Sequence, residues 1–215
     1  MESTDLGLFA AIHSMRAMRR LKPDPVPDSL IRGVLEAGIL APNPSNRQRW
    51  RFLVVRDPDR KRQVQRFYQQ AFDEGVRDHY VEGPLPPGVD REAYLRQLKA
   101  VAYLTEHFHE APVWIVACLE DGSAPGRGAG ASIYPAVQNM LLAARALGLG
   151  ATLTTRHLAH AAEVDAIFGL PPDAHSYAII PIGYPLGRFG PTRRAPLETV
   201  AFSDAWGEPL RLGGA

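Results

Sequence analysis

Apolar residues recur at helical spacing in several parts of the chain, and the most apolar such stretch is 132–150. Its apolar stripe consists of Ile133, Val137, Met140, Leu141 and Ala144. Only Gln138, Asn139 and Arg145 interrupt the remaining faces. A helix that is apolar nearly all round is buried on all sides, either in a thick core or against a second subunit. We expect Ser132 to be its N-cap, Pro135 to lie in its first turn and Gly148 to follow its end.

The same periodicity predicts elements on either side of this helix. Further helices are expected over 6–15, 29–40, 58–80, 91–108 and 161–168, and strands over 51–56, 113–119 and 177–183. The segment 151–155 is predicted to be a strand or extended. Helices and strands interleave without strict alternation, and we find neither a repeat nor a clean domain boundary. The pattern therefore predicts a single α+β or three-layer domain over 1–215.

Composition narrows the class of protein. The formal net charge of +1 and the separation of the arginines into three clusters argue against a nucleic-acid or anionic-membrane partner. The single cysteine, Cys118, stands in an apolar run and is predicted to be a small buried hydrophobe. The chain has no basic signal-like start and no apolar run near the roughly 20 residues of a membrane helix. We expect a cytoplasmic protein, and the scattered histidines predict no metal site.

Arginines supply the first candidate chemistry. The i, i+3 spacing of Arg16 and Arg19 would place them on one helical face, with Arg20 beside them. Together they could bind one anion such as a phosphate. The alternative is a solvated basic surface. Arg193 and Arg194 near the C-terminus allow the same two interpretations.

Two further segments carry polar groups. The loop APNPSNRQRW, 41–50, offers amide and hydroxyl groups to a flat ligand rich in heteroatoms, or it is a turn whose Asn and Ser residues bond their own backbone. Thr152, Thr154 and Thr155, followed by Arg156 and His157, are either a second polar set or an ordinary strand. The chain has no GxSxG, Walker, GxGxxG or CxxC motif.

Four separated segments together resemble the nitroreductase family. They are MRAMRRLKPDPVPDSLIRGVLEAG, APNPSNRQRWRFLVV, QNMLLAARALGLGA and IGYPLGRFGPTRRAPLETV. The resemblance implies a three-layer sandwich, with a central mixed sheet flanked by helices, in an intertwined homodimer. Two FMN molecules would lie at the subunit interface, and the central helices would pack against each other there, so we favour the second subunit as the cover of the apolar helix. A lid or insert at about 72–95 and a C-terminal tail at about 185–215, lying over the partner, are also implied.

The resemblance also implies a set of cofactor-binding residues. They are Arg16, Ala17, Met18, Arg19, Asn43, Pro44, Ser45, Asn46, Thr154, Thr155, Arg193 and Arg194. Arg16 would bind the FMN phosphate, with Arg193 or Arg194 closing from the tail, and Arg19 would approach the pyrimidine side of the ring. Residues 43–46 would come from the partner subunit, and residues 154–155 would meet the ring edge near N5. The chain departs from the family pattern at Met15, Ala17, Pro44, Arg49 and the pair 155–156.

The function implied is that of an FMN-dependent oxidoreductase. It would transfer hydride from NAD(P)H to a small acceptor, such as a nitroaromatic or a quinone, by a ping-pong mechanism that needs no catalytic side chain. One alternative is a flavin-consuming or dehalogenating relative on the same fold. Another is a flavin-binding or sensing protein without turnover.

Overall fold

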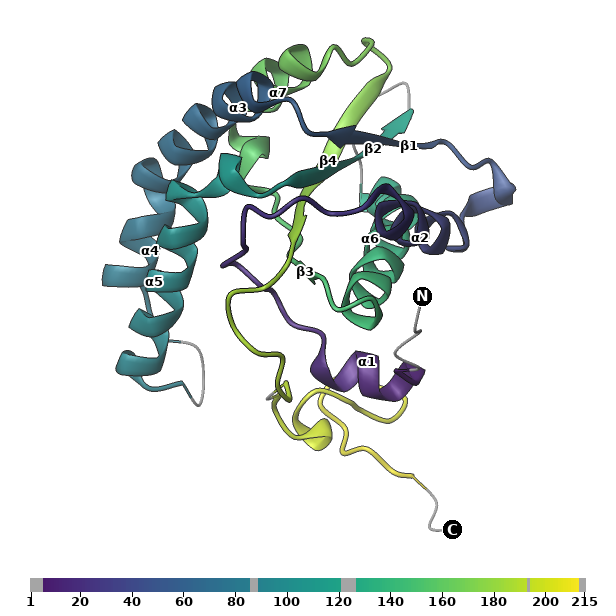
Figure 1. Cartoon of the computed structure of the whole chain (residues 1–215). Coiled ribbons are helices and arrows are strands. Elements are labelled where there is room, and N and C mark those ends of the chain that lie inside the picture. The colour runs from purple at the N-terminus through teal and green to yellow at the C-terminus, as the bar shows by residue number, and fades with distance from the viewer. Residues whose placement is uncertain (1–5, 86–88, 121–126, 193, 213–215) are drawn as a thin grey trace.

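The computed structural model describes residues 6–85, 89–120, 127–192 and 194–212, and it places helices on both faces of one sheet (Figure 1). The strands are β1 (Trp50–Val55), β2 (Val113–Glu120), β3 (Gly150–Ala151) and β4 (Ala174–Gly183). The α-helices are α1 (Leu8–Ser14), α2 (Asp28–Ile39), α3 (Pro58–Ala71), α4 (Arg77–Glu82), α5 (Arg91–Glu106), α6 (Arg127–Ala146) and α7 (Ala161–Phe168). The predicted α+β three-layer sandwich is confirmed.

The sheet has the order β1-β2-β4-β3, and every pairing among the described residues is antiparallel, which corrects the expected mixed sheet. After β1 the chain leaves along α3 and α4 and returns along α5, so Trp114 re-enters beside Val55 and β2 runs back along β1. The crossover through α6 does make β3 run in the same direction as β2. These two strands are not neighbours, because β4 lies between them with the opposite direction.

Alternation along β2 divides the core between the two faces of the sheet. Val113, Ile115, Ala117 and Leu119 pack with α2 and α6. Trp114, Val116 and Cys118 pack with α3, α5 and α7. Cys118 is fully buried, and burial raises the pKa of its thiol to about 12, so it is the small hydrophobe that the sequence predicted.

The apolar helix differs from its prediction in its start and in its cover. The helix α6 is already formed at Arg127, so Ser132 lies inside it and is not its N-cap, and Pro135 is internal. Packing of Ala129 against the core outweighs the low helix propensity of the glycines beside it. Met140 is fully buried within the chain, and a Cβ added to Gly38 of α2 would lie 2.2 Å from its Cε. This face therefore needs no second subunit to cover it.

The remaining predictions concern boundaries. The helix expected over 58–80 is α3 followed by a π-helical turn, Phe72–Val76, and α4. Extended structure at 151–155 is confirmed as β3 and an isolated bridge between Thr154 and Ile179, after which a 3-10 helix, Arg156–His160, begins. Shorter 3-10 turns cover Pro44–Asn46, Phe108–Glu110 and Leu197–Thr199. Among the described residues, the helices are all too short or too polar to cross a membrane.

Candidate functional site

The segment 16–20 is extended, which corrects the expectation that Arg16 and Arg19 share a helical face. The helix α1 ends at Ser14, and beyond it Met18 is buried and its N–H donates to the carbonyl of Ala151 at 3.0 Å. The segment thus runs beside β3 with its arginines directed away from the core. On the other side, the N–H of Leu186 donates to the carbonyl of Arg20 at 3.0 Å, so the chain after β4 lies against the same segment.

This arrangement forms a cleft of about 530 Å³ whose wall is rich in arginine. Its lining residues are Arg16, Ala17, Met18, Arg19, Arg20, Gln97, Ala100, Gly187 and Arg194. A guanidinium nitrogen of Arg16 donates to the carbonyl of Arg188 at 2.9 Å, and the guanidinium of Arg20 lies 4.9 Å from the ring centroid of Tyr103. Five of the predicted site residues therefore converge on one cleft, brought together from both ends of the chain.

Three arginines of this cleft, Arg16, Arg19 and Arg20, lack carboxylate partners among the described residues. Several guanidinium groups that share a concave surface without acidic partners form a site for an anion, and their planar forks suit phosphate. The arginine cleft is also within the size range of cofactor sites.

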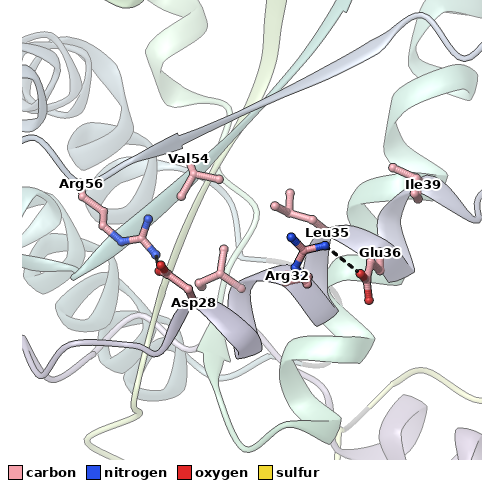
Figure 2. A pocket seen from close by; sticks show the side chains of 8 residues that line it. Asp28, Arg32, Leu35, Glu36, Ile39, Val54 and Arg56 are labelled. Carbon is pink, nitrogen blue, oxygen red and sulfur yellow. Dashed lines mark hydrogen bonds and ion pairs between the residues drawn. The ribbon is translucent and has the colours of Figure 1, made fainter.

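In a second cavity the charged side chains form ion pairs with one another (Figure 2). This groove of about 390 Å³ lies between α2 and β1, and its charges are paired: Asp28 with Arg56 at 2.6 Å, and Arg32 with Glu36 at 3.5 Å. The rest of its wall is apolar and includes Ile39, which is 50% exposed. The groove between α2 and β1 is thus an apolar surface along the edge strand and offers no unpaired charge to an anion.

Thr154 and Thr155 differ in what their side chains do. Thr154 is buried, and its Oγ1 lies 2.7 Å from the hydroxyl of Tyr68 on α3. Burial raises the pKa of Tyr68, so this hydroxyl stays protonated. Thr155 is exposed and stands just before the 3-10 helix 156–160. The charge of Arg19, which lines the arginine cleft, is among the effects that lower the pKa of Tyr68 against this rise, whereas neither threonine is among the residues that line the cleft.

A buried polar network, which the sequence analysis did not identify, holds the residues after Thr155 in place. The Nε2 of His157 lies 3.1 Å from the Oγ of Ser176, and this hydroxyl donates to a carboxylate oxygen of Asp165. His157 is fully buried, and burial lowers its pKa to about 4. The network joins the 3-10 helix to β4 and α7, and no local sequence signal links its three members.

The loop 43–48 lies apart from the arginine cleft in this chain. Ser45, Asn46 and Gln48 have left-handed φ values of 53°, 49° and 51°. The Oδ1 of Asn43 accepts the backbone N–H of Gln48 at 2.8 Å, and the Oδ1 of Asn46 accepts the Gln48 side chain at 3.2 Å. These acceptors thus serve the loop itself, as in the alternative interpretation. Asn43 and Pro44 line a separate cavity of about 170 Å³, which includes Ser132 of α6.

Structure and sequence therefore agree only in part on the site. The arginine cleft gathers residues 16–19 and Arg194, whereas residues 43–46 lie elsewhere in the same chain. Arg193 lies outside the described residues. Gln97, Ala100 and Gly187 were missed, because their approach to the arginines depends on packing between distant segments.

The chain is similar to several known proteins. A model of the nitroreductase family matches residues 12–184. An NADH dehydrogenase of Thermus thermophilus is 33% identical over 197 residues, covering 86% of this chain and 90% of that protein. An iodotyrosine deiodinase of Thermotoga neapolitana is 28% identical over 181 residues, covering 83% and 88%. A nitroreductase with bound FMN from Desulfitobacterium hafniense superimposes with a TM-score of 0.68 at 20% identity, covering 91% and 97%.

Proposed function

The chain belongs to the nitroreductase family, and from this premise we propose that it is an FMN-dependent oxidoreductase that transfers hydride from NAD(P)H to a small electron acceptor such as a nitroaromatic or a quinone. The observation that carries the proposal is the arginine cleft, in which Arg16, Arg19 and Arg20 form no ion pair with a carboxylate of the described residues. Such a surface fits a phosphate-bearing ligand. The FMN bound to the D. hafniense nitroreductase of the same fold makes FMN the favoured ligand.

The cofactor-binding residues predicted near the arginine cleft have proposed tasks. Arg16, with Arg193 or Arg194 from the tail, holds the phosphate. Ala17 and Met18 contribute backbone, since Met18 is anchored through its own N–H to Ala151. When bound, FMN would supply the hydride-transfer chemistry, with N5 as its reactive atom, that these side chains do not provide.

Arg19 has an electrostatic task in this proposal. A cation on the pyrimidine side of the ring stabilises the negative charge that reduction places there, and thereby raises the reduction potential. Thr154 and Thr155 would border the ring edge. The contact between Thr154 and Tyr68, at 2.7 Å, fixes the backbone on that side against α3.

The proposed assembly is a homodimer in which each chain is a single domain, 1–215, with a lid at about 72–95 and a tail at about 185–215 over the partner. Residues 43–46 would then complete the partner's site, which accounts for their distance from the arginine cleft of their own chain. Two exposed features support a subunit contact: Trp206 in the tail is 93% exposed, and an apolar groove follows the edge strand β1 (Figure 2). We propose a cytoplasmic location for this dimer.

A spectral experiment tests the function. The protein is purified, loaded with FMN and freed of excess flavin. We expect retained flavin absorbance, anaerobic bleaching by NADH or NADPH, recovery on addition of an acceptor, and the parallel double-reciprocal lines of a ping-pong mechanism. A protein that retains no FMN would contradict the assignment of the cleft. Bound FMN that neither nicotinamide bleaches would instead indicate a flavin-binding or sensing protein.

A dehalogenating activity is the second candidate, because the T. neapolitana relative named for it covers most of this chain. Release of iodide from 3-iodotyrosine by the reduced, FMN-loaded protein would support it. The absence of iodide release, alongside rapid reduction of a nitroaromatic or a quinone, would exclude it in favour of the first proposal.

A further inference from the structure

Arg156 is a fixed cation next to the proposed ring-edge residues. Its guanidinium carbon lies 4.3 Å from the ring centroid of Tyr68 and 5.1 Å from that of Phe72, both of which are aromatic faces that attract a cation. One guanidinium nitrogen donates to the hydroxyl of Thr105. This hydroxyl donates its own proton to the carbonyl of Val101 at 2.9 Å, so it is oriented to accept from the arginine. Groups from α3, the π-helical turn and α5 thus hold one guanidinium.

The positive charge of Arg156 has no acidic partner within the described ranges. Neither Asp nor Glu forms an ion pair with Arg156 there. Burial lowers the pKa of Arg156, the phenols of Tyr68 and Tyr80 oppose that shift, and Arg19 adds to it. Arg156 is therefore a partly buried cation without a carboxylate partner among the described residues, an arrangement that an anionic ligand would stabilise.

The guanidinium is held on one side and open on another. The Arg156 side chain is only partly buried, so part of it is reached by solvent. An arginine carries five N–H donors, and the one recorded bond to Thr105 leaves most of them available.

We propose that Arg156 binds a carboxylate carried by the electron acceptor, so that the protein prefers acidic aromatic acceptors over their neutral analogues. The inference rests on the proposed function and extends it to a substrate class. A planar guanidinium fork pairs with a carboxylate through two parallel hydrogen bonds. The rings of Tyr68 and Phe72 behind it, and the π-helical turn, a feature frequent at functional sites, indicate a built binding surface.

The test compares 4-nitrobenzoate with 4-nitrobenzamide, which share the ring and the nitro group and differ in charge. Calorimetric titration of the FMN-loaded, oxidised protein gives a Kd for each without turnover. We expect wild type to bind 4-nitrobenzoate the more tightly. Arg156→Gln should weaken 4-nitrobenzoate on the order of 10- to 100-fold, the range of a charge-assisted hydrogen bond, and leave 4-nitrobenzamide within about twofold. Arg156→Lys, which keeps the charge, should recover part of the loss.

Two controls make the outcome decisive. Arg66→Gln removes the same charge from an exposed position of α3 and should leave both affinities unchanged. Rapid-mixing reduction by NADH and NADPH separates the nicotinamide from the acceptor as the source of the anion. Equal weakening of both nitro compounds, or an effect confined to the nicotinamide step, would overturn the inference. Failure of the proposed function is distinguishable, because it appears as absent bleaching in wild type, whereas the calorimetric comparison needs no electron transfer.

Discussion

Replacing Arg16 with glutamine should weaken FMN binding while sparing riboflavin, which is the same flavin without its phosphate. The reasoning starts from the position of Arg16 in the arginine cleft, where a carbonyl oxygen is its recorded partner. A hydrogen bond to a charged group contributes about 1.5–3 kcal/mol. Since Arg16 is exposed and other arginines remain nearby, we expect the lower part of that range, about 1.5–2 kcal/mol, or roughly 10- to 30-fold in Kd.

Quenching of flavin fluorescence gives Kd for both ligands with wild type and variant, and the four values form a thermodynamic cycle. The coupling energy should equal nearly the whole loss for FMN, because riboflavin has no group for Arg16 to hold. The variant Arg66→Gln, at an exposed arginine of α3 outside the arginine cleft, is the matched control and should change neither Kd. A melting curve checks whether loss of the bond to the Arg188 carbonyl loosens the segment after β4.

Salt dependence gives an independent reading of the same contact. Wild-type affinity for FMN should fall as ionic strength rises, and the fall should be shallower in Arg16→Gln, because one screened charge is missing. If the variant lost FMN and riboflavin affinity equally, Arg16 would act on the shape of the site and not on the phosphate. Unchanged affinity for FMN would remove Arg16 from the site altogether.

Three further predictions concern stability. Burial lowers the pKa of His157 from 6.5 in the unfolded chain to about 4 in the folded one. The free energy of unfolding should therefore be highest above pH 6.5 and fall by about 3 kcal/mol as the pH drops towards 4. In denaturant titrations, His157→Gln should flatten this dependence on pH. Met140→Asp should unfold the chain itself by circular dichroism, whereas Gln138→Asp, on the exposed face of α6, should keep the fold. Gly38→Ala places a Cβ 2.9 Å from Met140 Cγ, and this overpacking should lower the free energy of unfolding by about 1–3 kcal/mol. Adding Met140→Ala in the same chain should recover part of the lost stability, as measured by thermal melts.

The sequence predicts best those elements that are marked by nearby residues and whose packing in the fold favours the same structure. The run 113–119 is continuous and β-branched, and β2 is buried along nearly its whole length. Asp57 caps α3 by accepting the N–H of Arg60, and Gly148 and Gly169 have the left-handed φ expected after a helix. The start of α6 was misplaced because proline and glycine weaken the local helix signal, whereas packing of Ala129 against the core, which decides the outcome, is not local.

The same distinction separates the predicted part of the site from the part that was missed. Arg16 and Arg19 are neighbours in sequence, so their proximity was visible, although the extended backbone that actually presents them was not. The contact between Arg156 and Thr105 spans 51 positions, and Ser176 lies 19 positions from His157. Such pairs meet only after the sheet and the helices have packed, and single-sequence patterns carry no trace of them.

The contacts that hold the residues around Thr154 differ between the side facing the sheet and the side facing the helices. On the sheet side, the bridge to Ile179 and the network of His157, Ser176 and Asp165 fix the backbone through β4 and α7. On the helical side, Arg156 is held by ring faces and one hydroxyl, which are weaker and more easily rearranged contacts. A shift of α5 relative to the sheet would therefore reposition the arginine while leaving the bridged backbone in place. Under the proposal that Arg156 binds the acceptor, such a shift would change acceptor preference without disturbing the backbone proposed to border the flavin.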